Sequence, residues 1–225
     1  MTFRKTLLTA SLFMLAMPLA SFAEDEAPEV STDGLQLVEK DSRGGIYADP
    51  DADWSSYTKI MIDEASVAFR KNWARDQNRN SAQRIRTSDI EKIKSGLAEL
   101  FNDVFATELS ENGGYQIVGA AGPDVLRITP HITDLDIYAP DVSSSMNSRS
   151  YTRSAGRMTL KLELFDSETG DLVAVAHDRR EATDRGYAQW ANRVSNTKEA
   201  RLMLKSWAKG MRVRLNEATG KPVAE

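Results

Sequence analysis

The chain has 225 residues, 41% of them hydrophobic, a formal net charge of −4 at pH 7 and no cysteine. This composition excludes disulfides, thiolate metal sites and cysteine nucleophiles. The mild acidity argues against nucleic acid or an anionic membrane surface as a general partner. The length is sufficient for one packed core and short for two.

The first residues have the pattern of a secretory signal peptide. Arg4 and Lys5 precede an apolar run at residues 7–20, and small residues follow up to Ala23. The alternative, an uncleaved membrane anchor, needs roughly 20 apolar residues, and Pro18 interrupts the end of this shorter run. We therefore predict cleavage after Ala23 and a periplasmic protein. Because no cysteine follows the apolar run, the common bacterial route of lipid attachment is closed and we expect no stable membrane anchor.

Residues 24–45 read "EDEAPEVSTDGLQLVEKDSRGG", which is polar and acidic, ends in two glycines and has few aliphatic residues to anchor it. This composition is typical of a flexible segment. We therefore expect a signal peptide at residues 1–23, a flexible acidic leader at residues 24–45 and a single folded domain at residues 46–220.

The first half of the domain combines a strand with a long helix. After a proline turn, a β-like run ends at Phe69. Apolar residues then recur at three- and four-residue steps from Ile90 to Leu109, which places them on one helical stripe. Ser88 and Glu91 form a capping box at the start of this helix, because each side chain can satisfy a free backbone amide.

The second half of the domain has the pattern of antiparallel strands. A short strand is predicted at residues 115–118 and a long one at residues 124–139. The apolar positions of the long strand change parity between Ile132 and Leu135, which indicates a β-bulge. Alternating apolar residues predict a hairpin over residues 157–180 with one solvated face.

A second helical stripe closes the domain. It runs from Ala200 to Leu215, with Asn196 and Glu199 as a capping pair at its start. A strand, a helix, several antiparallel strands and a closing helix define an α+β protein. We predict a single domain in which a twisted, mostly antiparallel sheet carries both helices packed on one face.

Four segments, in this order, resemble one bacterial family. They are "DPDADWSSYTKIMIDEASVAFRKNWARDQNR", "GPDVLRITPHITDLDIYAPD", "SRSYTRSAGRMTLKLELFDSETGDLVA" and "WANRVSN". The chain is similar here to domain-of-unknown-function family 3313, whose members are exported and often described as lipoproteins. The resemblance covers nearly the whole mature chain and implies an exported protein, but it brings no activity, substrate or catalytic residue. The missing lipidation cysteine sets this chain apart from the lipoprotein members.

Residues that could support catalysis are few. The chain has no nucleophile-elbow, phosphate-loop, zinc-protease or dinucleotide motif. Its two histidines, His131 and His177, together with Asp134 or Asp136, are the candidate ligands of a metal-assisted periplasmic hydrolase. The alternative is that each imidazole lies separately at a strand end or on the surface, and that the two aspartates form a solvated face. We prefer the alternative and expect no catalytic residue, metal or cofactor.

The segment "DPDADW" resembles the opening of an EF-hand loop, because Asp49, Asp51 and Asp53 alternate. However, Trp54 stands where the loop requires glycine, and Ile60 stands where it requires the bidentate glutamate. We therefore interpret the segment as a turn with aspartate caps that leads into a strand.

Arginine and aromatic residues gather in three polar segments, "FRKNWARDQNR", "SRSYTRSAGR" and "YAQWANR". Arginine forks match carboxylate and phosphate groups, and tryptophan and tyrosine supply rigid contact area. The candidate binding residues are Arg70, Trp73, Arg75, Asp76, Arg79, Arg149, Tyr151, Arg153 and Trp190. The alternative is that the tryptophans close the end of the core while the arginines form solvated ion pairs.

These segments predict a non-enzymatic interaction or accessory module of the cell envelope that uses loops carried on a rigid scaffold. The expected partner is another envelope protein, a second copy of the chain or an anionic envelope component, and not nucleic acid. The metal-assisted hydrolase is the alternative function.

Overall fold

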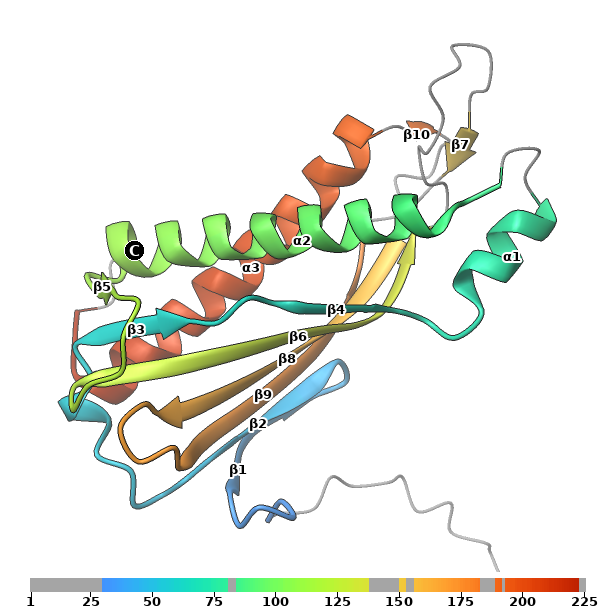
Figure 1. Ribbon diagram of the computed structural model, residues 1–225. Coiled ribbons are helices and arrows are strands. Elements are labelled where there is room, and N and C mark those ends of the chain that lie inside the picture. The colour runs from blue at the N-terminus through green and yellow to red at the C-terminus, as the bar shows by residue number, and fades with distance from the viewer. Residues whose placement is uncertain are drawn as a thin grey trace, which may run out of the picture.

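The computed structural model describes residues 30–80, 84–137, 150–152, 156–182, 189–191 and 193–222. An eight-stranded sheet forms one layer, and two long helices, α2 (Thr87–Thr107) and α3 (Arg193–Thr219), cross the same face of it (Figure 1). The α+β class, the single domain and the placement of both long helices on one face are therefore confirmed.

The strands of this sheet are β1 (Gln36–Asp41), β2 (Gly44–Ala48), β3 (Lys59–Ile62), β4 (Ser66–Phe69), β5 (Gln116–Ile117), β6 (Val125–Ile137), β8 (Gly156–Asp166) and β9 (Leu172–Glu181). In the order β1-β2-β9-β8-β6 every neighbouring pair is antiparallel. Beyond β6 the pairing is parallel, because β3 and β4 both pair with β6 and β5 pairs with β3. Parallel neighbours need a crossover connection, and α2 lies within the one between β3 and β5.

The hairpin β1–β2 occupies much of the segment that was expected to be a flexible leader. β2 pairs with β9 along its whole length, and Leu35, just before β1, is 3% exposed. The expected start of the domain at residue 46 is therefore wrong, because the sheet begins at β1. The glycines that suggested flexibility have a steric role, since a Cβ atom at Gly44 would collide with the backbone of His177.

Both long helices start earlier than predicted. The carboxylate of Asp89 accepts a hydrogen bond from the backbone N–H of Arg86, at 2.9 Å, and so caps α2 in place of the expected pair Ser88 and Glu91. Asn196, expected at the cap of the second helix, lies inside α3. The two segments were correctly predicted to be helices, but the residues that cap them were not predicted correctly.

Several short elements complete the described fold. They are a 3₁₀ turn (Trp54–Ser56), α1 (Trp73–Asn80), a π-helical turn after α2 (Glu108–Asn112) and a two-stranded ribbon of β7 (Ser150–Thr152) with β10 (Gln189–Ala191). None of the helices in the described segments is long and apolar enough to cross a membrane.

The predicted bulge in β6 is present and changes which side chains face the core. The register with β8 shifts between Thr133 and Asp136, and Asp134 has a φ of +51°. After the bulge Leu135 is buried in the core cluster, whereas Asp136 lies opposite Arg157. The bulge therefore turns a carboxylate away from the apolar layer and towards a cation.

The core lies between the sheet and the two long helices. Leu160 and Leu162 of β8 belong to it, and Phe101 stacks on Phe105 of α2 with ring centroids 4.0 Å apart. Lys161, between the two leucines, is exposed, as expected for a strand with one solvated face.

Candidate functional site

The segment "FRKNWARDQNR" forms the end of β4 and helix α1, and so is not the loop that we expected. Trp73 is 1% exposed and stacks on Phe69, with ring centroids 4.0 Å apart. Its indole N–H donates to the backbone carbonyl of Ile137 at 3.1 Å. Trp73 therefore closes the end of the core in this structure, and its side chain is not presented to a partner.

Asp136 is the centre of an ion cluster beside Trp73. Its side chain is 6% exposed and lies 2.9 Å from Nε of Arg70 and 3.2 Å from Nη2 of Arg157. Arg70 also reaches Asp76, with Nη1 and Oδ2 2.8 Å apart. The hydrogen bonds that Arg70 donates to Asp76 and Asp136 raise the pKa of Arg70, and the bond from Arg70 lowers the pKa of Asp76. The predicted residues Arg70 and Asp76 thus neutralise charges within the protein.

A shallow groove of about 330 Å³ lies between β4, α1 and the start of α2. Phe69 and Ile90 contribute apolar surface to it, and Arg70, Arg75 and Lys94 contribute positive charge. The described lining residues include no aspartate or glutamate. Arg75 is 64% exposed, and the carboxylate paired with it lies 3.8 Å away. The groove therefore presents cations beside an apolar surface.

Strand β4 also offers a backbone edge next to this groove. It pairs with β6 on one side, and in the described part of the chain no strand pairs with its other side. The unpaired N–H and C=O groups of such an edge are a template for an added strand from another chain.

The other predicted binding residues fall partly outside the described segments. Arg79 is exposed on α1. Tyr151 lies opposite Trp190 in the ribbon of β7 and β10, but the structure describes only their backbone. Arg149 and Arg153 lie outside the described residues.

Chain connections place α1 and the ribbon at one end of the sheet. β6 ends and β8 begins there, since Ile137 pairs with Gly156, and Trp73 bonds to the same Ile137. The ribbon strands directly precede β8 and α3, and Figure 1 shows them beyond the same end of the sheet as α1. The three polar segments of the sequence therefore share one end of the molecule.

The two histidines do not form the metal site of the alternative prediction. His131 of β6 and His177 of β9 both lie opposite Lys161 of the intervening strand β8. Two strand spacings put their backbones about 9.5 Å apart, with Lys161 on the strand between them. No group of three potential metal ligands occurs in the described part of the chain. The prediction that these imidazoles converge with Asp134 or Asp136 is wrong, because β8 separates the two histidines and Asp136 binds arginines.

His131 instead belongs to a polar network on the solvated face. Its Nδ1 is 2.7 Å from Oγ of Ser66, and its Nε2 is 3.1 Å from Oε2 of Glu163. This serine, imidazole and carboxylate order is that of a hydrolytic triad, but acyl transfer also needs donors that stabilise an oxyanion beside the serine. Asp63 and Glu64 precede Ser66 by three and two residues and would repel that charge. We therefore interpret the network as a surface hydrogen-bond cluster.

The carboxylates of "DPDADW" cap their own turns. Asp49 accepts a hydrogen bond from the N–H of Asp51 at 2.9 Å, and Asp53 accepts bonds from the N–H and the hydroxyl of Ser55. These bonds agree with the interpretation of the segment as a capped turn.

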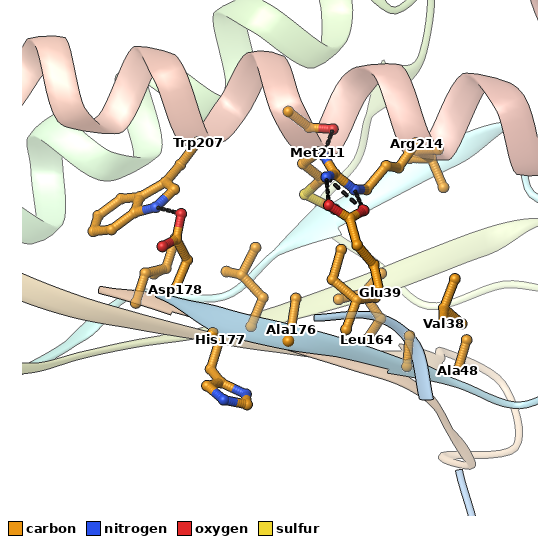
Figure 2. Close-up of a pocket in the computed structure, with 18 of the residues that line it drawn as sticks. Val38, Glu39, Ala48, Leu164, Ala176, His177, Asp178, Trp207, Met211 and Arg214 are labelled. Atoms are coloured by element: carbon orange, nitrogen blue, oxygen red, sulfur yellow. Dashed lines mark hydrogen bonds and ion pairs between the residues drawn. The ribbon is translucent and has the colours of Figure 1, made fainter. Parts of the chain in front are cut away.

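A larger cavity, of about 490 Å³, lies between α3 and the strands β1, β2, β8 and β9 (Figure 2). This volume is within the roughly 300–1,000 Å³ typical of small-molecule sites. The sheet contributes small residues to the lining, including Gly45, Ala48, Ala174 and Ala176. Short side chains leave this space below the helix. Sequence analysis missed the site, because these residue types carry no chemical signal of their own.

The two ends of the cavity differ in polarity. At one end Asp178 accepts hydrogen bonds from the indole of Trp207 and from Arg180, both at 2.9 Å. Arg43 lies at the same end, with its Nε 3.8 Å from Oδ1 of Asp178. Its Nη2 pairs with Oδ2 of Asp41 at 2.6 Å. The bond from Arg43 lowers the pKa of Asp41.

The opposite end of the cavity, near the 3₁₀ turn, is mainly apolar, because Trp54, Leu164 and Leu215 line it. Glu217 adds one exposed carboxylate on the last turns of α3. Between the ends, the carboxylate of Glu39 on β1 accepts two hydrogen bonds from Nη2 of Arg214 on α3, both at 2.6 Å (Figure 2). This ion pair connects the edge hairpin with the helix.

The fold is that of a single-domain α+β protein. It carries two concave surfaces, the groove beside α1 and the cavity beneath α3. The chain belongs to the family described as "Protein of unknown function (DUF3313)", which matches residues 26–211. This match confirms the family resemblance of the sequence. None of the curated proteins compared with the chain matches it.

Three solved structures illustrate the more distant likenesses. A PelC dodecamer variant from Paraburkholderia phytofirmans has 9% identity and a TM-score of 0.38, covering 79% of this chain and 98% of that one. A minor lipoprotein from Acinetobacter baumannii has 12% identity and a TM-score of 0.33, covering 73% and 94%. A Xanthomonas campestris protein of family DUF330 has 10% identity and a TM-score of 0.37, covering 77% and 91%.

Proposed function

We propose that this protein is an exported, non-enzymatic accessory protein of the bacterial cell envelope that binds an acidic, extended segment of a partner protein at the α1 end of the sheet. The predicted signal peptide at residues 1–23 supports export, and membership of the DUF3313 family agrees with it. The proposal rests mainly on one observation, which is that three cations and no acidic residue line the groove among the described residues.

The geometry favours an extended segment over a helix or a compact ligand. Among the described strands, none pairs with the second edge of β4 beside the groove, and main-chain hydrogen bonds along such an edge bind a strand of any sequence. Specificity then comes from side chains next to the strand, where Arg75 and Lys94 attract carboxylates. Arg70 is less available, because Asp76 and Asp136 already neutralise it.

The proposal is tested by photocrosslinking in cells. A photoreactive amino acid at Ala68, an exposed residue of β4 in the groove, is expected to crosslink to one defined partner. The double charge reversal Arg75→Glu and Lys94→Glu is expected to abolish that crosslink. Within the described part of the chain, the ion pairs of Arg75 and Lys94 lie at the surface, so the variant should remain folded.

The matched control reverses two exposed lysines of α3, Lys205→Glu and Lys209→Glu, which changes the net charge equally but away from the groove. This control is expected to keep the crosslink. A crosslink that survives the groove variant, or that both variants lose equally, would contradict the proposed binding site.

A further inference from the structure

We propose that the cavity beneath α3 binds the single acyl chain of a zwitterionic lysophospholipid, with the chain at the apolar end and a phosphoethanolamine head group at the polar end. This inference rests on a different surface from the α1 groove and is independent of the function proposed above. It follows from the shape of the cavity, the difference between its ends and the charges at its mouth.

The shape of the cavity selects a chain-like ligand. The lining residues of α3 extend from Ser206 to Ala218, which corresponds to about 18 Å along the helix axis. A volume of about 490 Å³ over that length leaves a channel about 5 to 6 Å wide. A peptide helix with its side chains is about 10–12 Å wide and does not fit. One extended aliphatic chain matches both the length and the width.

The gradient in polarity sets the direction of the chain. Trp54, Leu164 and Leu215 surround the apolar end, so burying methylene groups there is favourable. The polar end contains Asp178 and Arg43, whose carboxylate and guanidinium would remain with the head group. An amphiphile placed the other way would leave these charges against its chain, which is costly.

The charges at the mouth favour a zwitterionic head group over a simple anion. At the polar end Arg43 is paired with Asp41, and these side chains are 54% and 42% exposed. The pair of Arg214 and Glu39 lies between the ends of the cavity, and these side chains are 45% and 50% exposed. The mouth therefore presents both signs of charge. A phosphate can bind an arginine fork while an ammonium group faces the carboxylates.

Asp178 adds a reason to expect an ammonium group that carries N–H donors. Its Oδ2 accepts the bonds from Trp207 and Arg180, whereas its Oδ1 has no hydrogen-bond partner among the described residues. Nε of Arg43 lies 3.8 Å from this oxygen, too far for a good hydrogen bond. Ethanolamine can donate here after a small shift of Arg43, and a trimethylated amine cannot.

Tryptophan fluorescence tests the proposal on the purified protein. Trp54 lies at the apolar end and Trp207 at the polar end, so a lysophosphatidylethanolamine brominated near the end of its chain should quench Trp54 saturably. The substitution Trp54→Phe is expected to remove most of this quenching, whereas Trp73→Phe, at a tryptophan that does not line the cavity, should leave it unchanged. Quenching that persists in Trp54→Phe would overturn the proposed orientation.

Filling the cavity provides the matched test of location. Ala176→Leu places a larger side chain in the floor of the cavity and should weaken binding at least about ten-fold. Val175→Leu, the neighbouring residue on the opposite face of β9, should leave the affinity unchanged. No saturable quenching, or equal affinities for wild type and Ala176→Leu, would overturn the proposal.

The head group is tested with the brominated fatty acid of the same chain length. Tighter binding of the lysophospholipid supports the zwitterionic assignment. Tighter binding of the fatty acid would overturn that assignment, even if Ala176→Leu blocks both ligands.

Discussion

The α1 end of the sheet and the cavity beneath α3 are built from opposite kinds of residue. At the α1 end, a buried tryptophan stacks on Phe69 beneath the groove, and two aspartates pair with two arginines inside the protein. Beneath α3, glycines and alanines leave space that no side chain fills. The comparison shows that arginine, aspartate and tryptophan, which stand out in the sequence, can make their contacts inside the protein. Glycine and alanine, which do not stand out, can leave room for a ligand.

The largest expected effect is at Trp73, which represents the filled region. Trp73→Ala should lower the free energy of unfolding by about 4 kcal/mol, because it removes a buried aromatic and leaves a void. Trp73→Phe, which keeps the stack on Phe69 but loses the bond to Ile137, should cost about 1 kcal/mol. Urea unfolding measures both. If both substitutions lowered the free energy of unfolding by similar, small amounts, Trp73 would not be part of the core.

The second effect concerns the ion cluster. Asp136→Ala should destabilise by about 3 kcal/mol, because it leaves Arg70 and Arg157 without their shared buried carboxylate. Asp171→Ala, at an exposed turn, serves as the control and should change stability by less than about 0.5 kcal/mol. Equal values for the two variants in urea unfolding would mean that the cluster is solvated in solution.

The third prediction compares the filled core with the cavity directly. Ala208→Leu, at a fully buried position of α3, should destabilise by about 1–3 kcal/mol because the added atoms have no room. Ala176→Leu should change stability by less than about 1 kcal/mol, because the cavity accepts the larger side chain. Thermal or urea unfolding distinguishes the two. A large loss for Ala176→Leu would show that the cavity is closed in solution.

The smallest effect is expected at the ion pair beside the cavity. Glu39 and Arg214 are each about half exposed, so Arg214→Ala should cost less than about 1 kcal/mol. The loss should shrink further at high salt, where exposed charges are screened. A loss of several kcal/mol, or one insensitive to salt, would show that this pair holds the edge hairpin in place.

Local patterns predicted the antiparallel half of the fold well. The parity change between Ile132 and Leu135 located the bulge in β6, and the alternation in β8 gave the hairpin and its solvated face. Both signals arise within one or two strands, so a single sequence contains them. The strand β1 was missed, because its polar composition and the glycines of β2 also fit a flexible segment.

The parallel pairs and the two sites depended on contacts that are distant in sequence. β3, β4 and β5 are short, and their partners follow from how α2 crosses the sheet. At the candidate site, residue type identified Arg70 and Asp76 as a charged cluster but did not show that Asp136 completes it.

The sequence alone determined the elements whose signals are local. These are the two amphipathic helices, the long bulged strand, the hairpin and hence the α+β class, because hydrophobic periodicity reports which face of each element must be buried. The tertiary structure decided which charges are neutralised inside the protein, whether Trp73 faces a partner or the core, and where small residues from β2 and β9 meet α3. These features depend on how separate elements pack, and packing brings together residues that share no local pattern.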